Sequence, residues 1–253
     1  MHILQFNYRV KFKGVSSHLL KLLLSLLITV SSVFHPSLSV AQPQGAIADK
    51  ALKLNDVTLC TQDCIVTRHT RPGKLLVMGD SLSAAYGLDI EKGWVALLQG
   101  RYPNVDVINA SISGETTSGG KQRLPKLLEQ HQPDIMILEL GANDALRGQN
   151  LKVTQANLQS MIGACSSFNK ACKVILLGVQ LPTNYGPLYD KMFQKMYQDL
   201  TRQNNLLFDP FFIEPVALDP DLMQEDGLHP NADGQPLILH RLIPLIEKAV
   251  WSE

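Results

Sequence analysis

The sequence predicts an α/β protein built on a mostly parallel sheet of five strands. Three apolar runs, "KLLVM", "IMILEL" and "KVILLGV", lack the polar–apolar alternation of a strand with one exposed face. Strands of a parallel sheet have this composition because helices cover both faces. Segments of helical length separate the runs, and strands alternating with such helices indicate βαβ units.

The elements expected from this pattern alternate along residues 74–250. The expected strands are Lys74–Met78, Val105–Asn109, Asp134–Leu140, Lys173–Gln180 and Leu206–Phe208. The expected helices are Trp94–Tyr102, Lys121–Gln130, Leu151–Cys165, Pro187–Asn204 and Leu237–Val250. In an open parallel sheet, ligands bind at the carboxyl ends of the strands. The residues that follow each strand are therefore the candidates for a functional site.

Composition and charge fit a globular domain that binds no nucleic acid. The chain has 253 residues, of which 45% are hydrophobic and 18% charged, as expected for one folded domain. Four of the 23 basic residues and none of the 23 acidic ones lie in the first 41 residues, so the remainder carries a net charge of −4. This balance excludes a basic nucleic-acid surface.

The first 41 residues have the parts of a secretory signal peptide. A basic stretch at Arg9–Lys13 precedes an apolar run at Leu19–Phe34, and Ser39 and Ala41 supply the small residues of a cleavage site. We expect cleavage after Ala41. The alternative is a retained membrane anchor, but the uninterrupted part, Leu22–Phe34, is shorter than the roughly 20 residues of a bilayer span.

The predicted organisation has three parts. Residues 1–41 form the signal peptide, residues 42–72 an N-terminal extension without clear periodicity, and residues 73–253 the folded domain. The mature protein is expected in the periplasm or outside the cell, as a monomer without a stable membrane span.

The four cysteines fit an exported protein. They form two close pairs, Cys60 with Cys64 and Cys165 with Cys172. Four cysteines allow three pairings, and structural zinc sites usually have tighter spacing. Two local disulfides in an oxidising compartment are favoured, and cross-linking between the two pairs is the alternative.

Three residues have the chemistry of a nucleophilic triad. Ser81 follows the first strand, and a serine hydroxyl becomes a good nucleophile when a base takes its proton. His229 is the candidate base, and Asp226, three residues earlier, is the candidate acid that orients the imidazole. Each residue alone is more often part of an ordinary turn or cap; their combination after these strands favours catalysis.

An acyl-transfer site also needs donors for a developing oxyanion. The backbone N–H groups of Ser81 and Gly114 and the side-chain amide of Asn143 are the candidates, and glycine at 114 permits close approach of the backbone. Taken separately, Gly114 is typical of a turn and Asn143 of a helix cap. Asp80 is expected to be structural and Asp144 to bond local backbone.

Four segments together resemble the conserved blocks of the SGNH, or GDSL, hydrolase family. They are "GDSLS" with Ser81, "NASISGETT" with Gly114, "GAND" with Asn143, and "DGLHP" with Asp226 and His229. The stretches "RLPKLLEQHQPD", "LPTNYG" and "MQEDGLHPN" are similar to its bacterial thioesterase/lysophospholipase/arylesterase subgroup. The resemblance runs from Lys74 to the C-terminus and does not include Cys165 and Cys172.

The resemblance implies a flavodoxin-like, three-layer α/β/α fold and hydrolysis of acyl esters and thioesters without metal or other cofactor. It also implies that the loop after the fourth strand covers an acyl chain, with Leu181, Pro182 and Tyr185 as apolar contacts. An ordinary strand-to-helix connection is the alternative for this loop.

Export bears on the substrate, because acyl-CoA is a cytoplasmic metabolite. Small acyl esters, including lysophospholipids, are therefore expected as substrates. Two other functions stay open: an envelope carbohydrate O-deacetylase of the same fold, and a non-catalytic binding protein.

Overall fold

The folded domain contains a five-stranded parallel sheet. The computed structural model describes residues 73–251, so the predicted signal peptide, the N-terminal extension and the Cys60/Cys64 pair lie outside the described residues. The strands are β1 (Lys74–Gly79), β2 (Asp106–Asn109), β3 (Ile135–Glu139), β4 (Lys173–Leu177) and β5 (Leu207–Asp209). Their order in the sheet is β2-β1-β3-β4-β5, and every neighbouring pair is parallel. The predicted α/β fold is confirmed, with the strand order of flavodoxin-like proteins.

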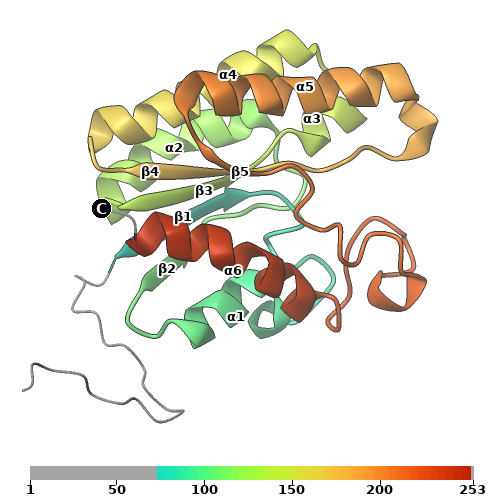
Figure 1. Cartoon of the computed structure of the whole chain (residues 1–253), viewed down its shortest axis with the longest axis horizontal. Helices are drawn as coiled ribbons and strands as arrows, with labels where there is room; N and C mark the ends of the chain where they lie inside the picture. The colour runs from blue at the N-terminus through green and yellow to red at the C-terminus, as the bar shows by residue number, and fades with distance from the viewer. Residues whose placement is uncertain (1–72, 252–253) are drawn as a thin grey trace, which may run out of the picture. The chain divides into compact units, whose positions relative to one another are not determined.

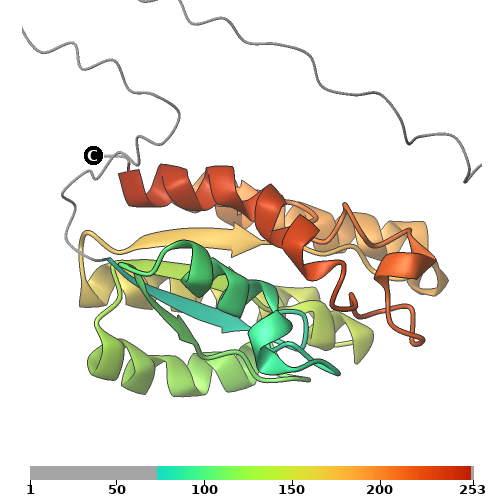
Figure 2. The same cartoon turned by 90° about the horizontal axis from the view of Figure 1, so that it is seen from below.

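Helices cover both faces of the sheet. The helices are α1 (Trp94–Arg101), α2 (Thr117–His131), α3 (Ala142–Leu146), α4 (Leu151–Phe168), α5 (Pro187–Asn204) and α6 (Gln235–Trp251), and the short 3₁₀ helices are η1 (Ile90–Lys92), η2 (Thr183–Tyr185) and η3 (Pro220–Leu222). Helices α1 and α6 lie on one side of the sheet and α2, α4 and α5 on the other (Figure 1; Figure 2 shows the same layers from below). This is the three-layer arrangement that the resemblance implied.

Burial explains the composition of the strands. All residues of β3, and all of β1 and β4 except their first lysines, are buried between the helical layers. The helices contribute one apolar face each; α5, for example, buries Phe193, Met196, Tyr197 and Leu200, which have helical spacing. The two edge strands, β2 and β5, are short and more exposed.

Two of the differences from the predicted element ends result from tertiary contacts. Helix α2 begins at Thr117, four residues before the expected Lys121, and Thr116 caps it by accepting a hydrogen bond from the N–H of Gly119. Strand β4 ends at Leu177 instead of Gln180. Its successor Gly178 passes so close to the next loop that a Cβ there would lie 2.7 Å from the carbonyl oxygen of Pro210.

The predicted local disulfide between Cys165 and Cys172 is present. It joins the last turn of α4 to the residue before β4, with a Cα–Cα distance of 5.7 Å. Cys165 is fully buried and Cys172 nearly so. Within residues 73–251, no helix is both long and apolar enough to cross a membrane.

Candidate functional site

Ser81 lies directly beyond the carboxyl end of the central strand β1. The strand is buried from Leu75 to Gly79, Asp80 is also buried, and Ser81 is the first partly exposed residue after the strand. The Asp80 carbonyl accepts hydrogen bonds from the N–H groups of Ser83 and Ala84, so the chain turns at once. A rigid strand and a tight turn thus hold the hydroxyl at the edge of the sheet where ligands are expected.

The structure brings Ser81, His229 and Asp226 into one hydrogen-bonded line. Ser81 Oγ lies 2.8 Å from His229 Nε2, and His229 Nδ1 lies 2.6 Å from Asp226 Oδ2. Both distances are within the range of strong hydrogen bonds. The order of the groups is that of a serine nucleophile, its base and the acid that orients the base.

The loop that carries His229 is organised by Asp226 itself. Oδ1 of Asp226 accepts the backbone N–H groups of Leu228 (2.9 Å) and His229 (3.0 Å), while Gly227 adopts a φ of +64°. Partial burial raises the pKa of Asp226, but the bonds from His229 and from these two N–H groups outweigh it and lower that pKa to about 2. Asp226 is therefore ionised at neutral pH, as an acid that stabilises a protonated imidazole must be.

Three hydrogen-bond donors border the same cavity as the Ser81 hydroxyl. Gly114, with a φ of +76°, follows β2, and Asn143 lies in α3 after β3. Within residues 73–251, the backbone N–H groups of Ser81 and Gly114 have no acceptor. The Asn143 amide donates one hydrogen bond, to Asp80 Oδ2 at 3.0 Å. Free donors beside a nucleophile are what an oxyanion requires.

The two other aspartates of the motifs are buried and hydrogen-bonded to other segments. Burial raises the pKa of Asp80 to about 6, although bonds from the Leu82 N–H and Asn143 and the charge of His229 act to lower it. The expectation that Asp144 bonds local backbone is wrong, because the backbone N–H that its carboxylate accepts belongs to a distant residue. Its carboxylate accepts the N–H and hydroxyl of Thr117, 27 residues away, and the side chains of Gln149 and Thr154, so it ties α2 to α3 and α4.

Apolar side chains form most of the cavity beside Ser81. Its volume is about 340 Å³, in the lower part of the usual range for small-molecule sites. The apolar lining residues are Leu82, Tyr86, Ala142, Leu146, Val179, Leu181, Pro182, Ile213 and Leu228. Two of the three predicted acyl contacts, Leu181 and Pro182, are among them.

The third predicted contact, Tyr185, is not part of the lining. Its hydroxyl donates to the carbonyl oxygen of Leu146 at 3.0 Å, which fastens the 179–186 loop to the end of α3. The N–H of Leu181 donates to Asp190 Oδ1 at 3.0 Å, a second tie between this loop and α5. Tyr185 therefore supports the loop in this structure from outside the cavity.

The sequence interpretation missed two residues at the site. The ring of Tyr86 lies 4.5 Å from that of His229, and Gln224 Nε2 donates to the Tyr86 carbonyl at 2.8 Å, so the Ser81 and His229 loops are joined. Glu139 is the other, at the end of β3. A carboxylate inside an otherwise apolar strand was the available signal for Glu139, whereas nothing local marks Tyr86.

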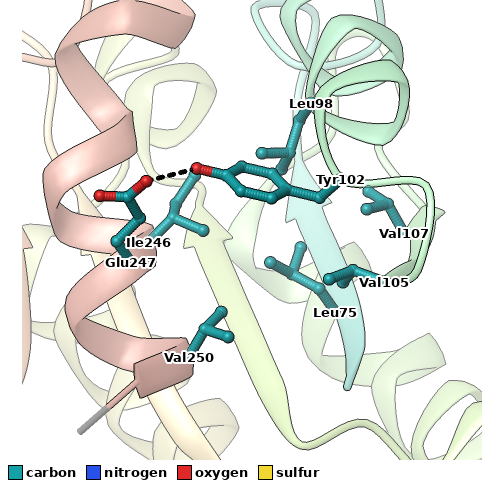
Figure 3. Close-up of a pocket in the computed structure, with 8 residues that line it drawn as sticks. All are labelled: Leu75, Leu98, Tyr102, Val105, Val107, Ile246, Glu247 and Val250. Carbon is teal, nitrogen blue, oxygen red and sulfur yellow. Dashed lines mark hydrogen bonds between the residues drawn. The ribbon is translucent and has the colours of Figure 1, made fainter. Parts of the chain in front are cut away.

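A second cavity lies at the opposite end of the sheet and has no catalytic chemistry. It is bounded by the first residues of β1, the end of α1, the segment before and within β2, and the end of α6 (Figure 3). Its lining is apolar apart from a hydrogen bond of 2.7 Å from the Tyr102 hydroxyl to Glu247. The lining residues that can titrate, Tyr102 and Glu247, are bonded to each other, so the candidate site is the cavity at Ser81.

Comparison with known proteins points to one family. Residues 77–237 match the model of the GDSL-like Lipase/Acylhydrolase family, a range that contains all five predicted triad and oxyanion residues. Esterase TesA of Pseudomonas aeruginosa is 43% identical over 192 residues, which cover 74% of this chain and 94% of that protein. The thioesterase 1/protease 1/lysophospholipase L1 of Escherichia coli K12 is 42% identical over 165 residues, covering 65% of this chain and 78% of that protein.

Comparison with solved structures points to the same family. The psychrotrophic esterase EstA from Pseudoalteromonas sp., in a structure inhibited by monoethylphosphonate, superposes with a TM-score of 0.66 at 43% identity. The superposition covers 70% of this chain and 97% of that one. The similarity thus extends over nearly the whole of the related domain.

Proposed function

Since the chain belongs to the GDSL-like lipase/acylhydrolase family, we propose that it hydrolyses acyl esters and thioesters through an acyl-Ser81 intermediate. The observation that carries the mechanism is the hydrogen-bonded line from Ser81 through His229 to Asp226 at the mouth of an apolar cavity. Similar relatives are named esterase and thioesterase, which are activities of the same acyl-transfer chemistry.

Acylation begins with His229. Its Nε2 takes the proton of the Ser81 hydroxyl as the oxygen attacks the carbonyl carbon of the ester, and the imidazolium then protonates the leaving alcohol or thiol. Asp226, ionised and held on Nδ1, stabilises that imidazolium. Deacylation repeats these steps with water as the nucleophile, and it releases the carboxylic acid and free Ser81.

The oxyanion of each tetrahedral intermediate accepts hydrogen bonds from the Ser81 N–H, the Gly114 N–H and the Asn143 amide. Donors fixed by the fold need no reorganisation when charge develops, which is why they lower the barrier. The bond from Asn143 to Asp80 Oδ2 leaves the second amide hydrogen available for the substrate oxygen.

The substrate is an ester or thioester whose acyl group is longer than acetyl, a class that includes lysophospholipids. The apolar lining, with Leu181 and Pro182 on one side, favours a hydrocarbon chain over a hydrated sugar. The predicted signal peptide and the Cys165–Cys172 disulfide support action in the periplasm or outside the cell. We propose that the protein acts there as a monomer.

The test is hydrolysis of p-nitrophenyl esters from acetate to palmitate by residues 42–253, with Ser81→Ala beside it. We expect medium or long chains to be preferred and kcat of Ser81→Ala to fall by at least about 10⁴-fold. Ser113→Ala, which removes another hydroxyl from the same cavity, is the matched control and should retain activity. Activity on acetate alone would favour the O-deacetylase, and an active Ser81→Ala would refute the mechanism.

A further inference from the structure

Glu139 is a carboxyl group buried within the sheet beside the proposed nucleophile. It is the last residue of β3, is 1% exposed, and stands opposite Gly79 of the neighbouring strand β1. Burying a carboxyl group costs free energy unless hydrogen bonds compensate it. The proposed reaction gives Glu139 no role, so its hydrogen-bond partners are the evidence for what it does.

Among the described residues, the two groups that donate hydrogen bonds to Glu139 both belong to the turn that carries Ser81. Oε2 of Glu139 accepts the backbone N–H of Asp80 at 3.1 Å and the hydroxyl of Ser83 at 2.8 Å. These donors lie one residue before and two residues after Ser81. A single oxygen atom therefore fastens the turn on both sides of the serine.

The backbone at Gly79 lies unusually close to Oε2 of Glu139. A Cβ built at Gly79 would lie 2.7 Å from Glu139 Oε2 and 2.7 Å from the Cβ of Ser83, closer than real Cβ atoms approach other atoms. Glycine at this position lets the turn reach the carboxyl group. The contact is thus a feature that three residues share: Gly79, Ser83 and Glu139.

A second buried carboxyl group, that of Asp80, adds to the effect of burial on the pKa of Glu139. Burial and the charge of the neighbouring Asp80 carboxylate raise the pKa of Glu139 well above its ordinary range. The hydrogen bonds from the Ser83 hydroxyl and the backbone N–H of Asp80 act to lower it. Asp80, with a pKa of about 6, is the member of the pair that ionises at neutral pH. The other titratable groups acting on this pair are His229 from the C-terminal loop and Tyr197 of α5.

We propose that Glu139 is a positioning residue that acts as a neutral acceptor and holds the 80–83 turn so that the Ser81 hydroxyl and N–H face His229 and the cavity. The inference rests on the proposed function, because it assumes that Ser81 is the nucleophile. Asp80 extends the same arrangement to the oxyanion site through its bond from Asn143. Loss of the acceptor should therefore slow the chemical step more than it weakens substrate binding.

The test compares Glu139→Gln with Glu139→Leu in the mature protein, with kcat and KM measured on a p-nitrophenyl ester of preferred length. Glutamine is neutral and keeps an oxygen for both donors, so kcat and KM should stay within about threefold of wild type. Leucine has similar size but leaves the Asp80 N–H and Ser83 hydroxyl without an acceptor. We expect its kcat to fall about 10- to 100-fold while KM changes less than about twofold, with the same loss in the rate of labelling by a fluorophosphonate probe.

Two results would overturn the inference. One is a folded Glu139→Leu protein, with native circular dichroism, whose kcat equals that of wild type. The other is an equal loss in Glu139→Gln and Glu139→Leu, which would mean that an anion is needed. If the leucine variant does not fold, Ser83→Ala replaces it, because it removes one of the two bonds to Glu139; unchanged kcat there would also contradict the inference.

Ser81→Ala separates this inference from the proposed function. An inactive Ser81→Ala together with a fully active Glu139→Leu would refute the role of Glu139 alone. An active Ser81→Ala would refute the proposed nucleophile itself, whatever the Glu139 variants do.

Discussion

Oγ of Ser81 lies 2.8 Å from Nε2 of His229, although 148 residues separate the two in the chain. The parallel sheet makes this contact possible, because the loops after its strands meet at one edge. Ser81 follows β1 directly, whereas His229 belongs to the long connection between β5 and α6. Their alignment depends on Asp226, which holds both the ring and the backbone of His229.

Asp226→Asn should lower kcat by about 10³- to 10⁴-fold with little change in KM. The amide cannot accept the His229 Nδ1–H with full charge and favours the wrong tautomer of the imidazole, an effect of this size in serine proteases. Steady-state kinetics on a p-nitrophenyl ester measures it. Glu225→Gln removes the adjacent exposed carboxylate and is the control; a loss of similar size in both variants would indicate a nonspecific charge effect instead.

Asn143→Ala should lower kcat by about 10²- to 10³-fold, because it removes one of the three proposed oxyanion donors. It also removes the bond to Asp80, so the variant is compared by circular dichroism before its kinetics are measured. Asn104→Ala, at an exposed position before β2, is the matched control and should behave as wild type. A folded Asn143→Ala enzyme with normal kcat would remove Asn143 from the oxyanion site.

Local sequence patterns predicted most of the fold because the strands are buried on both faces. The runs at β1, β3 and β4 have no exposed polar face, so their apolar composition alone is enough to predict buried strands. The ends of the helices and strands were harder to predict from the sequence. Helix α2 begins early because the Thr117 N–H donates to Asp144, a partner from another segment. Helix α3 occupies a stretch for which no helix was predicted.

The site was predictable to the extent that its residues lie in motifs. Ser81, Gly114, Asn143, Asp226 and His229 each belong to a Gly-rich segment, and the structure places all of them around one cavity or in its hydrogen-bonded line. Contacts between residues of different segments leave no motif in the sequence. The tilted ring contact between Tyr86 and His229 and the hydrogen bond from the Asp80 N–H to Glu139 arise from packing, which spacing in the chain does not encode.

Asp80→Asn should change the pH dependence of stability. The folded pKa of Asp80, about 6, is above its unfolded value of 3.8. Its contribution to the free energy of unfolding is therefore fully present below about pH 4 and is lost as the pH rises through 6. Relative to wild type, Asp80→Asn should gain on the order of 2–3 kcal/mol between pH 4 and pH 7.5. Urea unfolding at the two pH values measures this difference, and a constant difference would contradict the prediction.

Replacing Cys165 and Cys172 by alanine should lower the free energy of unfolding by about 2.5 kcal/mol. A disulfide that closes a loop of about eight residues restricts the unfolded chain by roughly this amount, and the pair is 7 residues apart here. Urea unfolding under oxidising conditions measures it. The matched variant replaces Cys60 and Cys64 and should cost less, since a disulfide between them would close a shorter loop. Equal stability of wild type and the Cys165/Cys172 variant would show that the bond constrains nothing.

Leu181→Ala should change acyl-chain preference rather than the chemistry. Leu181 is 8% exposed and lines the cavity beside Ser81, so its truncation removes apolar contact that only a longer chain can use. We expect kcat/KM to fall about tenfold for octanoate or decanoate esters and less than about twofold for acetate, the usual size for lost methylene contacts. Leu188→Ala, at a position 73% exposed on α5, is the matched control. An equal loss on all chain lengths would mean that the loop supports the site without contacting the acyl chain.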